Sequence, residues 1–183
     1  IPVLFIIGYP IQRWLLNPLM WQGMEAPMLT TFGLSVVFQS IFLLIWSSNA
    51  RSVKTSYTEN TLALGTIQIP LMYVISFVLA LVLVVALHLF VSNTKVGKAI
   101  RATAQSSQTA AVMGVNVKHI YALTFAIGAA ITAVGGVLVA STFFFVPTTG
   151  LSYLLKGFVL VVLGGMGSIW GTLLGGLVLG IAE

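Results

Sequence analysis

Three long apolar runs constrain the fold of this chain more than any other feature. They occupy residues 26–46, 70–93 and 120–142, and each is longer than twenty residues. A helix of about 20 apolar residues can cross about 30 Å of hydrocarbon. It also satisfies its backbone hydrogen bonds internally, as a segment in lipid must. The sequence therefore predicts an all-α fold, a polytopic transmembrane helical bundle.

The composition agrees with a membrane protein. Hydrophobic residues make up 58% of the 183 residues and charged residues only 6%, whereas soluble domains carry about a quarter charged residues. The net charge of +5 is concentrated in one polar segment, so it indicates membrane topology rather than nucleic-acid binding. The chain has no cysteine, which excludes disulfides, thiolates and cysteine–metal sites within it.

The polar segment 94–119 separates the second and third apolar runs. It contains four cations and no acid, namely Lys95, Lys98, Arg101 and Lys118. A Lys or Arg at the centre of a span costs about 2.5–3.5 kcal/mol, so this segment belongs in water. Its charge of +4 exceeds the +1 of residues 47–69, and cytoplasmic loops carry the excess of Lys and Arg. We therefore expect residues 94–119 in the cytoplasm and residues 47–69 outside.

The interior of this polar segment has helical periodicity. One face recurs at i, i+4, i+7 and i+11 with mostly small residues, which are Ile100, Ala104, Ser107 and Ala111. The polar face consists of Arg101, Gln105 and Gln108. Gly114 suits the left-handed position just after a helix end. On these residues alone, two interpretations stay open: a solvated connecting helix, or a helix whose small face lies against another protein.

The N-terminal region is predicted to end one span and continue along the membrane surface. Residues 1–9 form the tail of a span, and Pro10 breaks it. Trp and Arg favour the headgroup level, which predicts an interfacial segment containing Gln12, Arg13, Trp14, Asn17, Pro18 and Trp21. Because the chain begins and ends inside apolar runs, we expect a fragment of a longer membrane subunit.

Polar and small residues mark particular faces of the apolar runs. Ser35 and Gln39 lie at i and i+4, which is typical either of contact between bundle helices or of a substrate-path face. Gly128, Gly135 and Gly136 make one side of residues 120–142 small, together with neighbouring alanines. Small residues allow membrane helices to approach closely, so this side is predicted to pack against another helix.

A glycine-rich break interrupts the last apolar part of the chain. Residues 153–163 are too short to cross a membrane, and 169–183 resume the apolar pattern. Between them lie Gly164, Gly165, Met166, Gly167 and Ser168. Irregular backbone at membrane depth has to be buried in protein or line a wet cavity, and broken helices recur at transport sites. The alternatives are a re-entrant structural hairpin or a short turn between tilted helices.

Glycine spacing after this break adds a packing prediction. Gly171 and Gly175, and then Gly176 and Gly180, form two GxxxG spacings. This spacing predicts close helix packing in the C-terminal part of the chain.

No pattern for catalysis occurs in the sequence. There is no P-loop, no HExxH or GxSxG motif, no carboxylate pair and no metal-ligand cluster. We therefore predict a protein that is not an enzyme, without catalytic residues, metal or cofactor. If the chain belongs to a pump, the energy enters through another polypeptide.

The second half of the chain resembles a known family. The matching stretches are GKAIRATAQSSQTAAVMGVNVKHIYALTFAIGAA, then AVGGVLVAS, then KGFVLVVLGGMGSIWGTLLGGLVLGIAE. They are similar to permease subunits of bacterial ABC importers for branched-chain amino acids, to which urea and simple-sugar permeases are related. The resemblance is specific from about residue 97 to 183 and looser over WLLNPLM and TTFGLSVVFQS.

The resemblance implies a single permease domain over residues 1–183 of an inner-membrane subunit. Its expected partners are membrane lipid, a second homologous permease, cytosolic ABC ATPase subunits and an external solute-binding protein, with no nucleic acid. The polar segment would be the coupling segment that enters a cleft on the ATPase. Its candidate residues are Lys98, Arg101, Ala104, Ala110, Ala111, Met113, Gly114 and Asn116. Many relatives are acidic where this chain has SSQT at 106–109, a departure that bears on the choice of ATPase.

The expected cargo is a small amino acid of the branched-chain type. The candidate path residues are Gly164, Gly165, Gly167, Ser168, Gln39 and Ser35, none of them charged. Urea or a short amide and a simple sugar remain alternatives within the same family. A passive channel or facilitator, and a purely structural membrane subunit, are alternatives of other classes.

Overall fold

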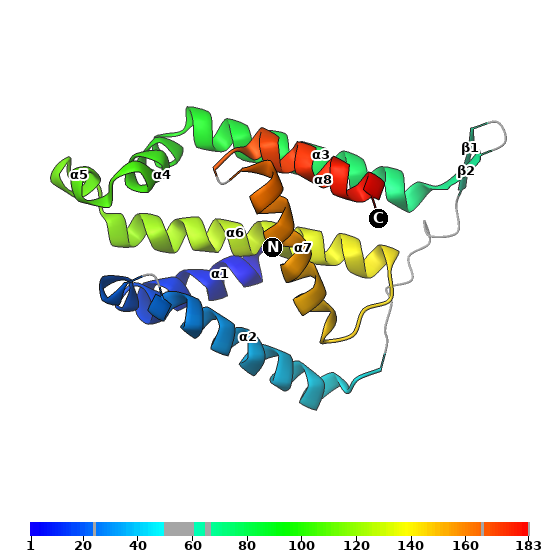
Figure 1. The fold of residues 1–183 in the computed structure, drawn as a ribbon, viewed down its shortest axis with the longest axis horizontal. Coiled ribbons are helices and arrows are strands. Elements are labelled where there is room, and N and C mark those ends of the chain that lie inside the picture. Colours follow the sequence, from blue (N-terminus) through cyan, green and yellow to red (C-terminus); the bar gives the residue numbers. More distant parts are fainter. Residues whose placement is uncertain (24, 50–60, 65–66, 166, 183) are drawn as a thin grey trace. The chain divides into compact units, whose positions relative to one another are not determined.

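The computed structural model describes residues 1–23, 25–49, 61–64, 67–165 and 167–182, and the described part is almost entirely helical (Figure 1). The elements in chain order are α1 (Pro2–Pro10), the π-helix η1 (Ile11–Leu16), the 3-10 helix η2 (Leu19–Gln22), α2 (Glu25–Trp46), β1 (Thr61–Leu64), β2 (Ile67–Pro70), α3 (Leu71–Asn93), α4 (Lys95–Gln105), α5 (Ser107–Val112), α6 (Val117–Thr142), α7 (Thr149–Gly164) and α8 (Ile169–Ala182). The predicted helical fold is confirmed. The two strands form a short antiparallel hairpin that pairs Thr61 with Pro70.

Three described helices, α2, α3 and α6, are long and apolar enough to cross a membrane. They coincide with the three apolar runs of the sequence. The pair α7 and α8 is bent by 120° at its break and counts as a fourth span if taken as one. The predicted broken helix pair near the C-terminus is therefore present. Helix α7 begins at Thr149, four residues before the expected start of the short helix.

The chain divides into two compact units. The first contains Ile1–Phe38 and Ser52–Phe144, and the second contains Gln39–Arg51 and Phe145–Glu183.

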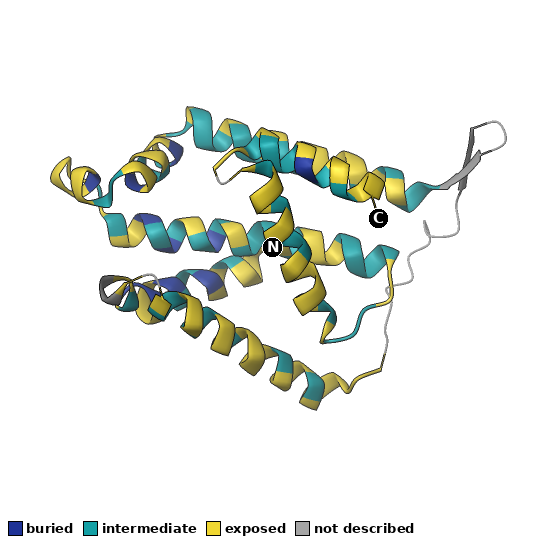
Figure 2. Cartoon of the chain, viewed as in Figure 1, coloured by how far each residue is buried: buried dark blue, intermediate teal, exposed yellow. Residues whose placement is uncertain are grey.

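The core of the first unit lies between α1 and the N-terminal half of α6. Figure 2 shows buried residues along both helices. Ala122 and Ala126 are fully buried, and a Cβ placed on Gly8 would lie 3.1 Å from the Cβ of Ala129. Small residues on both helices therefore let the backbones approach, as packing in a membrane requires.

The glycines of α6 do not make this contact. A Cβ on Gly128, Gly135 or Gly136 would meet no described atom within 4 Å. These three glycines therefore make no close contact within the described part of the chain, and their packing against another helix stays a prediction. The close contact with Gly8 of α1 is made by Ala126 and by Ala129, and Ala129 is one of the alanines on the predicted small side.

Pro10 does not break the N-terminal helix. It has helical dihedral angles, and the chain continues directly into the π-helix η1. The N–H of Asn17 donates to the carbonyl of Gln12 at 2.8 Å, an i to i−5 bond. Proline removes one backbone donor and crowds the preceding turn, and the wider turn that follows accommodates this change without ending the helix.

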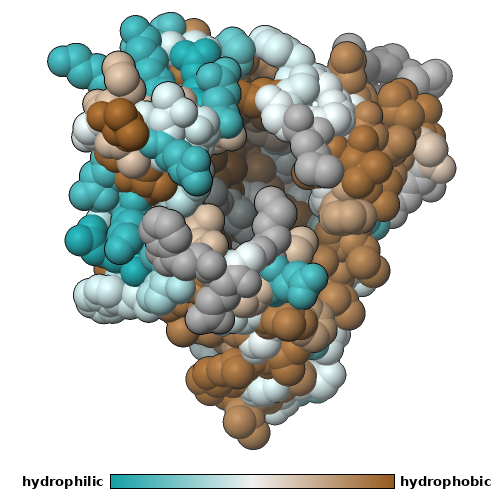
Figure 3. Space-filling view, turned by 60° about the vertical axis from the view of Figure 1, so that its left-hand side comes forward, coloured by the Kyte–Doolittle hydropathy of each residue, from teal (hydrophilic) through white to brown (hydrophobic). Residues whose placement is uncertain are grey.

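Most of the remaining surface is apolar. Neither α2 nor α3 contains a buried residue, and side chains such as Phe32, Leu44 and Phe77 are exposed. Figure 3 shows hydrophilic residues gathered on one side of the visible face and hydrophobic residues over much of the rest. Exposed apolar area on this scale belongs against lipid or other protein chains.

Candidate functional site

The polar segment between α3 and α6 folds as two short helices. The interruption is Ser106, whose backbone is extended and whose Oγ accepts from the N–H of Thr109 at 3.2 Å. A serine that bonds the backbone three residues ahead favours a helix start over a helix interior. The predicted single face from Ile100 to Ala111 is therefore wrong. Its members are divided between α4 and α5.

Helix α4 is held tightly against the end of α3. The side chain of Thr94 caps α4 by accepting from the N–H of Gly97 at 3.0 Å. A Cβ on Gly97 would overlap the carbonyl oxygen of Val91 and lie 2.6 Å from that of Phe90. Only a glycine lets the chain reverse this closely at the start of the candidate coupling segment.

Arg101 has a local structural partner. Its Nη2 donates to the carbonyl oxygen of Ser92 at 3.0 Å, in the last turn of α3. A cation at a helix C-terminus satisfies an unpaired carbonyl and complements the helix dipole. Arg101 is exposed as well, so it fixes the turn while part of its side chain still faces outward.

Gly114 ends α5 in the predicted left-handed conformation, with φ of +86°. The N–H of Val115 donates to the carbonyl of Ala110, and that of Gly114 to the carbonyl of Ala111, each at 3.0 Å. This pair of bonds is the Schellman arrangement. The prediction for Gly114 is confirmed.

Asn116 begins the next helix. Its Oδ1 accepts from the N–H of His119 at 3.1 Å, so α6 starts at Val117, inside the segment 94–119. Asn116 is a helix cap in this structure, a role that the sequence pattern did not single out.

Seven of the eight candidate coupling residues are exposed, and Ala110 is buried at 4% exposure. Ala110 therefore packs inside the segment and does not face a partner. The two residues that stand out most are Val112 and Met113, which are 86% and 79% exposed. They form an apolar tip on a segment whose other exposed residues include Lys98 and Gln105.

The structure also reveals a polar cluster that sequence reasoning missed. It joins the end of α1 and η1 to the first turn of α6, and its members are Tyr9, Gln12, Arg13, Asn17, Lys118 and His119. The sequence predicts residues 12–17 only as part of an interfacial segment. The π-helical turn aligns positions 12 and 17, five apart, and no α-helical pattern signals that alignment.

The candidate path residues lie in two places. Gly165 and Gly167 both have positive φ, of +80° and +93°, so glycine is suited to this break between α7 and α8. The Oγ of Ser168 accepts from the N–H of Gly171 at 3.0 Å and caps α8. Ser35 and Gln39 lie one turn apart on α2, and the Oγ of Ser35 donates to the carbonyl of Phe32 at 2.8 Å. Their role in a path stays a prediction.

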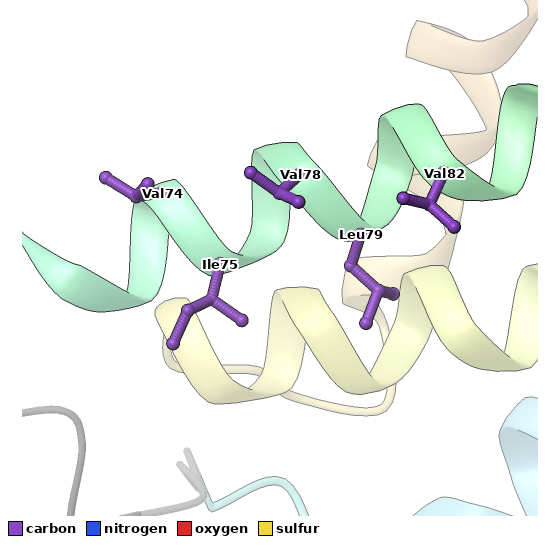
Figure 4. Close-up of a pocket in the computed structure, with 5 residues that line it drawn as sticks. All are labelled: Val74, Ile75, Val78, Leu79 and Val82. Atoms are coloured by element: carbon purple, nitrogen blue, oxygen red, sulfur yellow. The ribbon is translucent and has the colours of Figure 1, made fainter.

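A groove along α3 is entirely aliphatic. Its lining residues are Val74, Ile75, Val78, Leu79 and Val82, all from one helix (Figure 4). Recognition of an amino acid's carboxylate and ammonium needs polar groups, which this lining lacks. In the described part of the chain, no group of three or more His, Asp or Glu residues could hold a metal.

Comparison with known proteins supplies the class. The model of the family described as "Branched-chain amino acid transport system / permease component" matches residues 3–183. The fold and this match together define a multi-pass membrane permease component. The chain belongs to the branched-chain amino acid transport permease family, and it is an inner-membrane protein.

Individual relatives agree with the family. The high-affinity branched-chain amino acid transport system permease protein BraD of Pseudomonas aeruginosa is 34% identical over 181 residues, covering 96% of this chain and 59% of the relative. The corresponding protein LivH of Escherichia coli K12 is 32% identical over 185 residues, with the same two coverages. The ribose import permease protein RbsC of Haemophilus influenzae is 28% identical over 143 residues, covering 73% of this chain and 44% of that protein.

The chain thus spans about three fifths of the length of the first two relatives. No solved structure matches it at a significant level.

Proposed function

We propose that the whole protein is the membrane-spanning permease subunit of an ABC importer. It moves a small amino acid of the branched-chain type inward, and partner ATPases supply the energy. The observation that carries this proposal is the family match over nearly the entire chain, from residue 3 to 183. The three membrane-length helices and the water-facing basic segment between α3 and α6 support it.

Segment 94–116 is the proposed ATPase-docking element. Its two helices are fixed by caps at Thr94 and Ser106 and by the Schellman end at Gly114. This fixed frame presents Val112 and Met113 to solvent. A rigid element with an apolar tip suits insertion into a cleft, since little conformational entropy is lost when it binds.

The remaining partners are a second homologous permease, which would cover apolar helix faces, and an external solute-binding protein. The break at residues 164–168 is the proposed position of the path, because its positive-φ glycines place irregular backbone between two apolar helices.

A simple sugar is the second candidate cargo. The similarity to a ribose import permease favours it, at lower identity and coverage than the amino-acid permeases. Urea and passive flux have no comparable observation in their favour.

The test uses the full-length parent protein with its partner ATPases and binding protein in liposomes. Radiolabelled leucine, ribose and urea are offered with and without ATP. ATP-dependent uptake of leucine alone is the expected result, and equal flux without ATP would replace the importer by a facilitator.

Docking is tested separately by labelling. Because these 183 residues contain no cysteine, Val112→Cys introduces one defined thiol once any cysteines elsewhere in the parent are replaced. Its reaction with a maleimide should slow strongly when the ATPase is added. Thr148→Cys, also at an exposed position, is the control and should not change. Equal reaction rates at Val112→Cys with and without ATPase would contradict docking.

A further inference from the structure

The first turn of α6 is connected to the N-terminal helix at two polar points. At the first point, the hydroxyl of Tyr9 lies 2.8 Å from Nδ1 of His119, and Arg13 donates to the same hydroxyl from Nη1 at 2.7 Å. The Tyr9 and His119 rings also meet edge to face, with centroids 5.7 Å apart. Arg13 and His119 are exposed, and Tyr9 is half-buried.

The second point is buried. Asn17 is 5% exposed, and its Nδ2 donates to the carbonyl oxygen of Lys118 at 3.0 Å. Its Oδ1 accepts from Nε2 of Gln12 at 3.1 Å, and Gln12 is 7% exposed. Both ends of the Asn17 amide are thus engaged. A buried amide of this kind has one satisfied orientation and resists displacement.

These contacts do more than join two helices. The apolar contact between Gly8 and Ala126 already packs α1 against α6. The polar points lie in the first turn of α6, which follows directly after the proposed docking element 94–116, two to three residues beyond the cap Asn116. The second point also depends on the π-helical turn of η1, a departure from α-helical geometry that occurs frequently at functional sites.

We propose that Asn17 and Tyr9 are positioning residues that link the coupling segment to the N-terminal helix. When an ATPase displaces the coupling segment, the first turn of α6 carries α1 and η1 with it. Without the two contacts, α6 moves alone, and part of its movement is not transmitted to α1 and η1. The inference rests on the proposed docking of segment 94–116.

The experiment compares Asn17→Asp with the wild-type chain in the complete, full-length transporter in liposomes. The aspartate keeps the acceptor for Gln12 but replaces the donor to Lys118 with an oxygen that faces its carbonyl. Asn49→Asp is the matched control, because it makes the same chemical change at an exposed asparagine. The measured quantity is substrate transported per ATP hydrolysed, normalised to purified, assembled complex.

We expect Asn17→Asp to lower this ratio by about fivefold or more, the usual lower end of coupling between sites, while Asn49→Asp leaves it unchanged. Tyr9→Phe is the second variant. It keeps the ring against His119 and removes only the hydroxyl, so the complex should assemble normally with a smaller loss of the ratio. If the complex with Asn17→Asp does not assemble, the ratio measured for Tyr9→Phe decides whether the inference holds. A role in folding alone would lower the amount of complex and leave the ratio intact.

Wild-type ratios in the assembled variants would overturn the inference. Failure of the proposed function can be distinguished from failure of this inference. If the proposed docking is wrong, the ATPase does not protect the Val112→Cys thiol from the maleimide in an otherwise wild-type chain. Protection there together with unchanged ratios would reject the positioning role alone.

Discussion

Gly171 of α8 lies directly against the carbonyl oxygen of Gly164 in α7. A Cβ on Gly171 would overlap that oxygen, and a Cβ on Gly164 would lie 2.5 Å from the Cα of Thr172. The two helices of the bent pair therefore touch through backbone atoms. A third glycine, Gly175, continues the contact, with a Cβ position 3.3 Å from the N of Gly164. Of the two GxxxG spacings, the one at Gly171 and Gly175 forms this contact.

Gly171→Ala should separate α7 from α8. The methyl group has no room because its neighbour is backbone, and overpacking of this kind costs about 1–3 kcal/mol. The thermal unfolding midpoint of the purified full-length subunit in detergent is the measurement. Gly180→Ala is the control, since a Cβ there meets no described atom within 4 Å. An equal midpoint for both variants would show that the two helices do not touch.

Gly97→Ala should disrupt the reversal between α3 and α4. The added Cβ would lie 2.5 Å from the Cα of Val91, so α4 has to move and the bond from Arg101 to Ser92 is lost. We expect a loss of roughly 1–3 kcal/mol in stability and weaker ATPase binding. Gly128→Ala, on an open side of α6, should be neutral or slightly stabilising. Normal ATPase affinity in Gly97→Ala would contradict the role of this turn.

Substitutions at Gly114 test the cost of the backbone conformation separately from steric overlap. A Cβ there meets no described atom within 4 Å, so only the φ of +86° opposes a side chain. Alanine should cost about 1–2 kcal/mol in local stability, and asparagine less because it tolerates this region. Hydrogen exchange of the α5 amides in the full-length protein measures the effect. The expected order of protection is glycine, asparagine, alanine, and any other order would argue against a left-handed end.

Topology can be tested with single thiols in sealed vesicles. Val112→Cys and Thr148→Cys lie beyond opposite ends of α6, and both positions are exposed. If α6 crosses the membrane with its basic end inside, an impermeant maleimide labels Thr148→Cys in right-side-out vesicles and Val112→Cys only in inverted ones. Labelling of both cysteines from the same side of the membrane would show that α6 does not cross it.

Much of the fold was predictable because the membrane imposes strong local rules. Length and apolarity were sufficient to predict α2, α3 and α6, and a run of glycines was sufficient to predict the break before α8. Gly114 was predictable because a left-handed helix end is a property of a few neighbouring residues. The eight candidate coupling residues were predicted as a set, and the structure separates buried Ala110 from the exposed remainder.

Tertiary structure decided which residues meet. Ala126 and Ala129 lie against α1, whereas the glycines of α6 do not. A single sequence does not show which side of a helix will face its neighbour when several sides carry small residues. The contact of Asn17 with Lys118 joins positions 101 residues apart and depends on a π-helical turn. The sequence alone determined which segments form long apolar helices and where the last helix pair breaks, since those properties follow from local composition. Helix rotation and the polar cluster depend on contacts between distant segments, which only the folded chain brings together.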